Sequence, residues 1–463
     1  MILKFDESYF AGTRPPVRPD GAHEAVSFWH ETVTIEPGAP LAEDTTCDVV
    51  VVGGGFTGLS TAIEIKRGAP ELDVVLLERG VCGHGASGRN GGFAMPLIGW
   101  DLSDAARQLG NERAREAYRL MYKAVAHLKR VIKDHGIDCD LEETGYLLLA
   151  TCEARRRRLL HEDRLAQELG FDIAWLEGEA LREHIRSEQF LGGLYDPYPC
   201  IVNPAKLTRG LADLASELGV RVYEQTPLQR LEVNDSGVEA SAAGGSVKAK
   251  LGMLAVNGYG NALGFMPNQV MPVHTYIVLT EPLAPAQLEE IGWANKRTSL
   301  ETARNMIHYF RLTADNRILF GGEDVELYYG GRYEDAHEPI FNALTARFRE
   351  YFPSLANVGI THQWGGQLGV TMDMFPTFGE TGPGNNLFYA TGYSGHGVSL
   401  SNYAGRILAP RILERLGHPA EPHDGEPFFY NRRPMRLPPE PFRYLGMRAY
   451  RRLLRAQDRL QKA

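Results

Sequence analysis

The clearest hydrophobic pattern in the chain is a strand, glycine turn, helix and second strand near its start. The β-branched run 48–52 ends in glycines, and residues 57–66 follow with the composition of a helix. Residues 73–77 then repeat the apolar pattern of a buried strand. Two such strands joined through a helix predict a βαβ unit with a parallel sheet.

Helical and strand patterns alternate beyond this unit. Apolar residues between 112 and 133 recur at helical spacing, which predicts a long amphipathic helix that leaves the first unit. A strand is expected over 146–150 and a helix over 153–169. We interpret the basic run 155–158 within that helix as a solvent-exposed face, as most such runs are.

The middle of the chain is expected to return to the first sheet. Asn203 before Pro204 predicts a helix start, because Asn caps free N–H groups and Pro fits the first helical position. Strands over 220–233 and 250–258 follow, and the second ends in glycine, as buried parallel strands beside a ligand often do.

The residue pattern changes over 268–350 and predicts a second sheet. Alternating strands at 274–279, 306–312 and 317–321 surround the turn segment TADNR. Short alternating strands joined by polar turns are typical of an antiparallel sheet. No internal repeat of 20–50 residues is visible, which argues against a solenoid or a propeller.

Charge and composition narrow the function classes. The chain has 49 Lys and Arg against 58 Asp and Glu, a net charge of −9, which argues against a general nucleic-acid binder. It has no apolar run long enough to cross a membrane and no recognisable secretion signal, so we expect a cytoplasmic protein. The five cysteines are scattered without zinc-ligand spacing, so we expect reduced thiols and no metal.

The C-terminal residues 447–463 predict a helix with six basic side chains and one acid, Asp458. Such a helix on an acidic protein is expected to dock on its own chain or on a sister subunit. An oligomer formed through this helix is therefore one alternative. Binding to a membrane surface is a less favoured alternative.

The first glycine turn carries a dinucleotide-binding signature. Gly53, Gly55 and Gly58 fit the pattern GxGxxG between a strand and a helix, and Glu78 lies 20 residues after the last of them. The glycines permit a tight turn, close approach of a pyrophosphate to a helix N-terminus, and close helix packing. A carboxylate at the position of Glu78 accepts the ribose hydroxyls.

Two further glycine-rich segments favour FAD over NAD. Residues 82–92 contain five glycines where a simple NAD enzyme continues into another helix, and Ser87 and Arg89 add a hydroxyl and a cation. A third turn, 392–397, opens a helix whose N-terminus would stabilise negative charge on a reduced flavin.

In these segments the sequence resembles the D-amino-acid oxidase and sarcosine oxidase family of FAD-dependent enzymes. The resemblance is greatest to the gamma-glutamylputrescine oxidase subgroup and covers most of residues 45–415. The segments that carry it are CDVVVVGGGFTGLSTA, GASGRNGG, YFRLTADNRILFGG and GYSGHGV. It implies an α/β fold with two interleaved domains: a Rossmann-like FAD-binding domain with a parallel sheet, and a substrate domain on a mostly antiparallel sheet.

The resemblance also implies the domain boundaries. We expect the FAD-binding domain to comprise 45–105, 190–265 and 355–420, and the substrate domain 106–189 and 266–354. Residues 1–44 would form an arm on the surface and 421–463 a tail with the basic helix.

The residues implied to bind FAD come from six parts of the chain. In order, they are Gly53, Gly55, Phe56, Thr57, Gly58, Glu78, Arg79, Ala86, Ser87, Arg89, Asn90, Gly91, Gly92, Leu228, Gly258, Gly392, Tyr393, Ser394, Gly395, His396, Gly397 and Val398. The backbone of a strand over 226–228 would reach the adenine, and Gly258 would lie against the pyrophosphate. FAD is expected to be noncovalent, because no cysteine lies beyond Cys200 and the family's histidine attachment position aligns with Arg89.

The implied chemistry is oxidation of a small-molecule amine. Hydride passes from the carbon beside nitrogen to the flavin, the imine is hydrolysed, and O₂ or another acceptor takes the electrons. Tyr309 and Arg311 are expected to face the substrate, and His274 and His396 to tune its protonation. Phe93 stands where polyamine-type relatives often carry Gln, so an N-methyl amino acid or an aminophosphonate remains an alternative to a gamma-glutamyl polyamine. A flavoprotein with structural or regulatory FAD is a further alternative.

Overall fold

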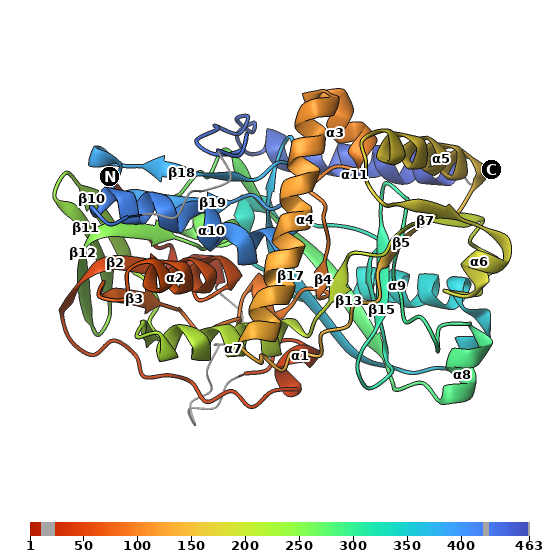
Figure 1. The fold of residues 1–463 in the computed structure, drawn as a ribbon, viewed down its shortest axis with the longest axis horizontal. Coiled ribbons are helices and arrows are strands. Elements are labelled where there is room, and N and C mark those ends of the chain that lie inside the picture. Colours follow the sequence, from red (N-terminus) through yellow and green to blue (C-terminus); the bar gives the residue numbers. More distant parts are fainter. Residues whose placement is uncertain (11–23, 420–425, 462–463) are drawn as a thin grey trace.

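Two sheets organise the chain in the computed structural model, which describes residues 1–10, 24–419 and 426–461 (Figure 1). In the first sheet the strand order is β1-β10-β11-β12-β2-β3-β9, with β19 beside β12 and β18 beside β19. Its strands are β1 (Ile2–Lys4), β2 (Thr45–Val52), β3 (Val74–Leu77), β9 (Arg221–Tyr223), β10 (Arg230–Asn234), β11 (Gly237–Ala242), β12 (Gly245–Leu254), β18 (Thr377–Thr381) and β19 (Leu387–Thr391).

The centre of this sheet is the expected parallel unit. β12, β2, β3 and β9 run parallel, and β19 is parallel to β12 on its other side. The last four residues of β2 and all of β3 are buried, which explains their unbroken apolar sequence. The βαβ unit and the return of 250–254 to the first sheet are therefore confirmed.

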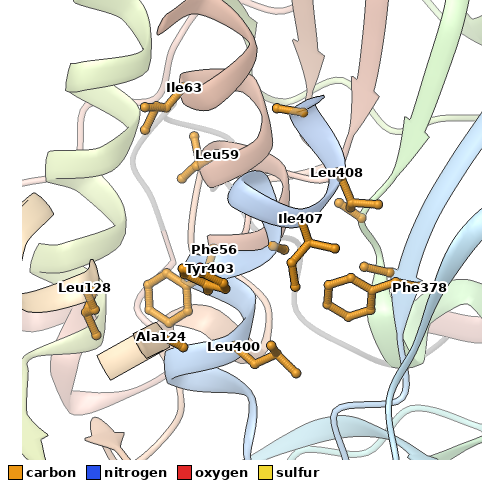
Figure 2. Packing of buried hydrophobic residues seen from close by; sticks show 14 of the residues in the cluster. Phe56, Leu59, Ile63, Ala124, Leu128, Phe378, Leu400, Tyr403, Ile407 and Leu408 are labelled. Atoms are coloured by element: carbon orange, nitrogen blue, oxygen red, sulfur yellow. The ribbon is translucent and has the colours of Figure 1, made fainter. Parts of the chain in front are cut away.

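Helices cover this sheet and form the largest hydrophobic core. They are α2 (Phe56–Gly68), α3 (Leu102–Leu109), α4 (Asn111–Asp134), α7 (Pro204–Glu217) and α10 (Gly397–Arg415). Figure 2 shows Leu59 and Ile63 of α2, Tyr403 of α10 and Leu128 of α4 in this cluster of buried hydrophobic residues. At the start of α7, the Asn203 side chain accepts a hydrogen bond from the backbone N–H of Lys206 at 3.2 Å, so the expected cap is confirmed.

The second sheet has the order β17-β13-β16-β15-β14-β5-β7-β6. All its neighbouring strands are antiparallel except the pair β14 and β5. The strands are β5 (Tyr146–Ala150), β6 (Ala174–Leu176), β7 (Gly192–Asp196), β13 (Val270–Thr280), β14 (Ser299–Thr302), β15 (His308–Leu312), β16 (Ile318–Gly322) and β17 (Ile360–Thr371). A small separate pair joins β4 (Phe93–Ala94) to β8 (Cys200–Ile201).

The two faces of this sheet have different neighbours. One face packs against α9 (Glu338–Tyr351) in an aromatic core that includes Phe310, Phe320 and Phe348. The opposite face carries Tyr309, Arg311 and Glu301, because side chains alternate along each strand. The remaining helices are α1 (Phe28–Glu31), α5 (Glu153–Glu168), α6 (Gly178–Arg182), α8 (Pro285–Glu290) and α11 (Phe442–Leu460).

The domain boundaries differ from the expected ones in three places. β7 and β17, which we assigned to the FAD-binding domain, belong to the second sheet. α4, which we assigned to the substrate domain, packs on α10 in the core of the first sheet. Periodicity shows which face of a helix or strand is buried but not which sheet it belongs to or covers. The local sequence was therefore not sufficient to assign these elements to a domain.

The described parts of the N-terminal arm are built into the fold. β1 pairs with β10 at the edge of the first sheet, and the Trp29 side chain of α1 is 1% exposed. The Trp29 indole N–H donates to the backbone oxygen of Asn90 at 2.9 Å. The expectation of an arm lying on the surface is therefore wrong for these segments, while residues 11–23 lie outside the described part of the chain.

The C-terminal helix α11 docks on its own chain beside α5 (Figure 1). Asp458 is 1% exposed and accepts a hydrogen bond from Arg155 at 2.5 Å. Arg451 forms ion pairs with Asp324 and Glu326 at 2.7 and 2.6 Å. Docking on its own chain is confirmed, but the interpretation of the 155–158 run as solvent-exposed is wrong for Arg155, which is 3% exposed.

Within the described ranges, none of the helices combines the length and the apolar character needed to cross a lipid bilayer.

Candidate active site

A cavity of about 750 Å³ lies between the glycine turns and the second sheet. This volume is within the range of roughly 300–1,000 Å³ that is usual for cofactor and ligand pockets. Of the residues expected to bind FAD, those that line the cavity are Gly53, Gly55, Phe56, Thr57, Glu78, Arg79, Ala86, Ser87, Arg89, Asn90, Leu228, Tyr393, Gly395, Gly397 and Val398. The structure thus gathers segments up to 345 positions apart around one space.

The first glycine turn leaves no room for side chains. Gly53 has φ +110°, and a Cβ there would lie 2.6 Å from the backbone oxygen of Ala255. A Cβ on Gly58 would lie only 1.9 Å from the backbone oxygen of Gly53. Gly55 caps the N-terminus of α2 beside the cavity. The turn therefore presents backbone and the positive end of a helix dipole to the cavity, as a dinucleotide phosphate requires.

Glu78 lies at the end of β3, where the ribose-binding carboxylate of this motif is expected. Its two oxygens accept hydrogen bonds from the backbone N–H groups of Gly54 at 2.7 Å and Gly80 at 2.9 Å. Burial raises the pKa of this carboxyl group. The two backbone donors fix the carboxylate at the cavity wall.

The second glycine-rich loop is held by contacts with segments that precede and follow it in the sequence. Arg89 is 4% exposed, donates from Nε to the backbone oxygen of His84 at 2.8 Å, and pairs with Asp335 at 3.3 Å. The Ser87 hydroxyl accepts from the backbone N–H of Phe56 at 3.0 Å, so this loop contacts the start of α2.

The third turn is joined directly to the first. The hydroxyls of Thr57 and Tyr393 lie 2.7 Å apart, a hydrogen bond between residues 336 positions apart. Burial raises the pKa of Tyr393, which therefore stays protonated at neutral pH. The helices α2 and α10 thus begin next to each other at the cavity, as the two glycine turns predict.

Several other expected FAD residues do not line this cavity. They are Gly58, Gly91, Gly92, Gly258, Gly392, Ser394 and His396. Gly258 packs against the backbone of Leu368 in β17, and its neighbours Val256 and Asn257 line the cavity instead. The segment 226–228 lines the cavity as a loop between β9 and β10, so its assignment as a strand is wrong.

Arg311 holds the loop and does not face the cavity. Its guanidinium is fully buried, lies over the Trp29 ring, and donates to the backbone oxygens of Val202 at 2.7 Å and Gly91 at 3.3 Å. Burial lowers its pKa to about 10. The expectation that Arg311 faces the substrate is therefore wrong, because Arg311 does not line the cavity and donates to the backbone oxygens of Gly91, Val202 and Leu312.

Tyr309 lies on the same sheet face, beside the end of that loop. Its ring centroid is 5.6 Å from that of Phe93, in an edge-on arrangement. A Cβ on Gly91 would lie 3.1 Å from the Tyr309 ring. Its role as a substrate contact stays a prediction.

The two histidines are held neutral by burial. The pKa of His274 is lowered to about 3 and that of His396 to about 4. His274 accepts a hydrogen bond from the backbone N–H of Glu334 at 3.2 Å, beneath the cavity wall. His396 is the residue before α10. Their proposed effect on substrate protonation stays a prediction.

Part of the cavity wall consists of residues that sequence reasoning did not indicate. Tyr259 and Tyr333 line it with their rings 6.0 Å apart, and Asp335 pairs with Arg89. Segments 27–28 and 361–364 also line it. These residues come from short helical turns, irregular segments or a strand end, so no periodicity or motif indicates them. All five cysteines are free, and the described residues contain no group of three or more potential metal ligands.

Comparison with known proteins assigns the family. Residues 48–411 match the model of the FAD-dependent oxidoreductase family DAO. The chain is 33% identical to gamma-glutamylputrescine oxidoreductase of Escherichia coli, over 80% of this chain and 84% of that one. It is 31% identical to the probable oxidoreductase OrdL of Haemophilus influenzae, over 81% and 86%.

Solved structures show the same fold. The glycine oxidase of Geobacillus kaustophilus superposes with a TM-score of 0.66 at 23% identity, covering 82% of this chain and all of that one. The L-proline dehydrogenase of P. horikoshii gives a TM-score of 0.67 at 20% identity, over 81% and 95%. The glycine cradle at Gly53 and Gly58 and the long cavity fit an FAD molecule. The chain belongs to the DAO family of FAD-dependent oxidoreductases.

Proposed function

We propose that this enzyme oxidises an amine at the carbon beside nitrogen and that its substrate is a polyamine or a gamma-glutamyl polyamine. The observation that carries the proposal is the similarity to gamma-glutamylputrescine oxidoreductase across four fifths of both chains. FAD, when bound, accepts the hydride that leaves the amine. Loss of hydride gives a protonated imine, and water then releases an aldehyde and ammonia.

The reacting nitrogen must be neutral when the hydride leaves, because an ammonium group has no lone pair to form the imine. Apolar surroundings favour the neutral amine over the ammonium. Next to the second loop, Phe93, Met95 and Leu148 belong to one apolar cluster. The buried imidazoles of His274 and His396 add no positive charge there at neutral pH.

The hydrogen bonds of Arg311 argue against a substrate that is recognised through an anionic group next to the reacting carbon. An N-methyl amino acid or an aminophosphonate needs a cation with free donors near the reacting carbon. On this sheet face, Arg311 is bound to the backbone oxygens of Gly91 in the loop and of Val202. A polyamine has no anionic group, and the carboxylate of a gamma-glutamyl polyamine is remote from the carbon that is oxidised.

Anaerobic reduction of the flavin tests the proposal. The holoenzyme is mixed with polyamines, their gamma-glutamyl forms, N-methyl amino acids and aminophosphonates, and the flavin absorbance is followed. Bleaching by the first two classes supports the proposal. Bleaching only by the last two assigns the alternative substrates, and an oxidised flavin with every compound assigns a structural or regulatory role to FAD.

A further inference from the structure

The carboxyl group of Glu301 stands on the sheet face that carries Tyr309. Glu301 of β14 is directly opposite Tyr309 of β15 in the antiparallel register, so their side chains share this face. Tyr309 in turn contacts Phe93 and Gly91 at the end of the second glycine-rich loop. Glu301 is therefore one strand farther from this loop than Tyr309.

The surroundings of Glu301 are apolar. In the register of the sheet, Glu301 is next to Leu148 on the neighbouring strand β5. Leu148, Met95 and Ala303 belong to one buried hydrophobic cluster. Desolvation by burial is the largest influence on Glu301 and raises its pKa to about 8, and the charge of Asp101 acts in the same direction. A carboxylate in such a place is costly unless a cation compensates it.

The protein supplies little positive charge to Glu301. Arg158 is the cation that lowers its pKa, but Arg158 pairs with Asp101 at 3.4 Å and donates to the backbone oxygen of Ala303 at 3.2 Å. The Tyr146 hydroxyl lies beside Glu301 and lowers the pKa of this carboxyl group by hydrogen bonding, and the Tyr146 side chain is only 5% exposed. Tyr146 also lines a small cavity of about 40 Å³ together with Met95 and Asp101.

Other buried acids of this region have their donors in place. Glu162 accepts from the backbone N–H of Ser103 at 3.1 Å. Asp196 accepts from the Tyr122 hydroxyl at 2.7 Å and from the backbone N–H of Tyr198 at 2.9 Å. Glu301 differs from these acids because, among the described residues, the Tyr146 hydroxyl donates to it but no backbone N–H group does.

We propose that Glu301, with the Tyr146 hydroxyl, binds a second, non-reacting ammonium group of the substrate. The substrate class is then amines that carry another cationic nitrogen, and the inference rests on the proposed function. A carboxylate near an amine favours its charged form. It therefore suits the nitrogen that stays protonated, whereas the nitrogen that is oxidised must be neutral.

The test compares 1,4-diaminobutane with butylamine, which has the same carbon chain and one nitrogen. Apparent dissociation constants are measured anaerobically from flavin reduction rates, or from shifts of the oxidised flavin spectrum where no reduction follows. In the unmodified enzyme the diamine should bind about tenfold more tightly or better, as expected for a hydrogen-bonded charge pair. Glu301→Gln should bring the two amines to within about threefold of each other.

Glu323→Gln is the matched control. Glu323 is bonded to His308, whose side chain lies on the opposite face of β15, so this variant should keep the full preference for the diamine. An unmodified enzyme without preference, or a Glu301→Gln enzyme that keeps it, overturns the inference. FAD content and melting temperature are measured for each variant.

A second variant tests the inference if Glu301→Gln does not fold. Glu301→Asp retains the charge but retracts it by one methylene, so it should weaken the preference for the diamine, and an unchanged preference overturns the inference. A different result contradicts the proposed function, namely that no amine of any class reduces the flavin. The spectral titration still measures the preference in that case.

Discussion

The two sheets contribute to the cavity in different ways. The first sheet presents glycine turns, in which a Cβ at Gly53 or Gly58 would collide with backbone. The second sheet presents side chains, such as Trp364 and Leu368 of β17 at the cavity wall. Backbone cannot be exchanged by substitution, whereas side chains can. The cofactor side should therefore tolerate almost no change, and the substrate side should change specificity without loss of FAD.

The largest effect is expected from Gly58→Ala. The new Cβ would lie 1.9 Å from the backbone oxygen of Gly53, so the turn must open and its approach to the phosphates is lost. We expect protein purified with less than about a tenth of the normal FAD, measured by the ratio of flavin to protein absorbance. Gly446→Ala is the control, because a Cβ there meets no atom within 4 Å. A full complement of FAD in Gly58→Ala would show that the cofactor side tolerates substitution.

Asp458→Ala should lower stability without affecting FAD. The substitution leaves the buried Arg155 and the backbone N–H groups of Asn305 and Met306 without their acceptor. Breaking a buried pair costs about 3–5 kcal/mol, which thermal unfolding of the holoenzyme measures. Limited proteolysis should then cut α11 first. Arg448→Ala, on the exposed side of α11, should change little, and an unchanged melting temperature in Asp458→Ala would show that α11 is held by other contacts.

His396→Asn should slow flavin reduction by a factor of about ten, which corresponds to the net worth of about one hydrogen bond. Burial lowers the pKa of His396 to about 4, so the imidazole is neutral at pH 7 and protonates only as the pH falls towards 4. The effect of the substitution should therefore be constant between pH 6 and 8. Stopped-flow measurements check both points, and an unchanged reduction rate removes His396 from the mechanism.

The smallest expected effect concerns the link between FAD and protein. Arg89 stands at the family's histidine attachment position and is bound to the backbone of His84, so no covalent bond is expected. After acid precipitation the yellow colour should be in the supernatant. A yellow pellet would contradict this, and His84→Ala would then show whether His84, which lines the cavity, forms the bond.

The sequence predicted the cofactor side well because its determinants are local. The strand before Gly53, the helix after it and Glu78 all lie within about 35 residues, and each has a motif or a period. Two facing turns were also predictable, since 392–397 repeats the glycine pattern at a helix start.

The substrate side was predicted less well because its determinants are long-range. Alternation along 308–312 shows that Tyr309 and Arg311 share a face, but not that the Arg311 donors are taken by Val202 and Gly91. The sequence around Arg155 likewise does not show that it pairs with Asp458, 303 residues away. Glu301 looks like an ordinary strand residue until the register places it opposite Tyr309.

The hydrogen bond between Thr57 and Tyr393 has a consequence for how the enzyme matures in the cell. Domains form as units while the chain is synthesised from its N-terminus. Thr57 leaves the ribosome early, but the wall it shares with Tyr393 is complete only after about five sixths of the chain has been made. Uptake of FAD is therefore a late step, and a chain that stops before α10 carries the complete dinucleotide motif and still cannot enclose the cofactor.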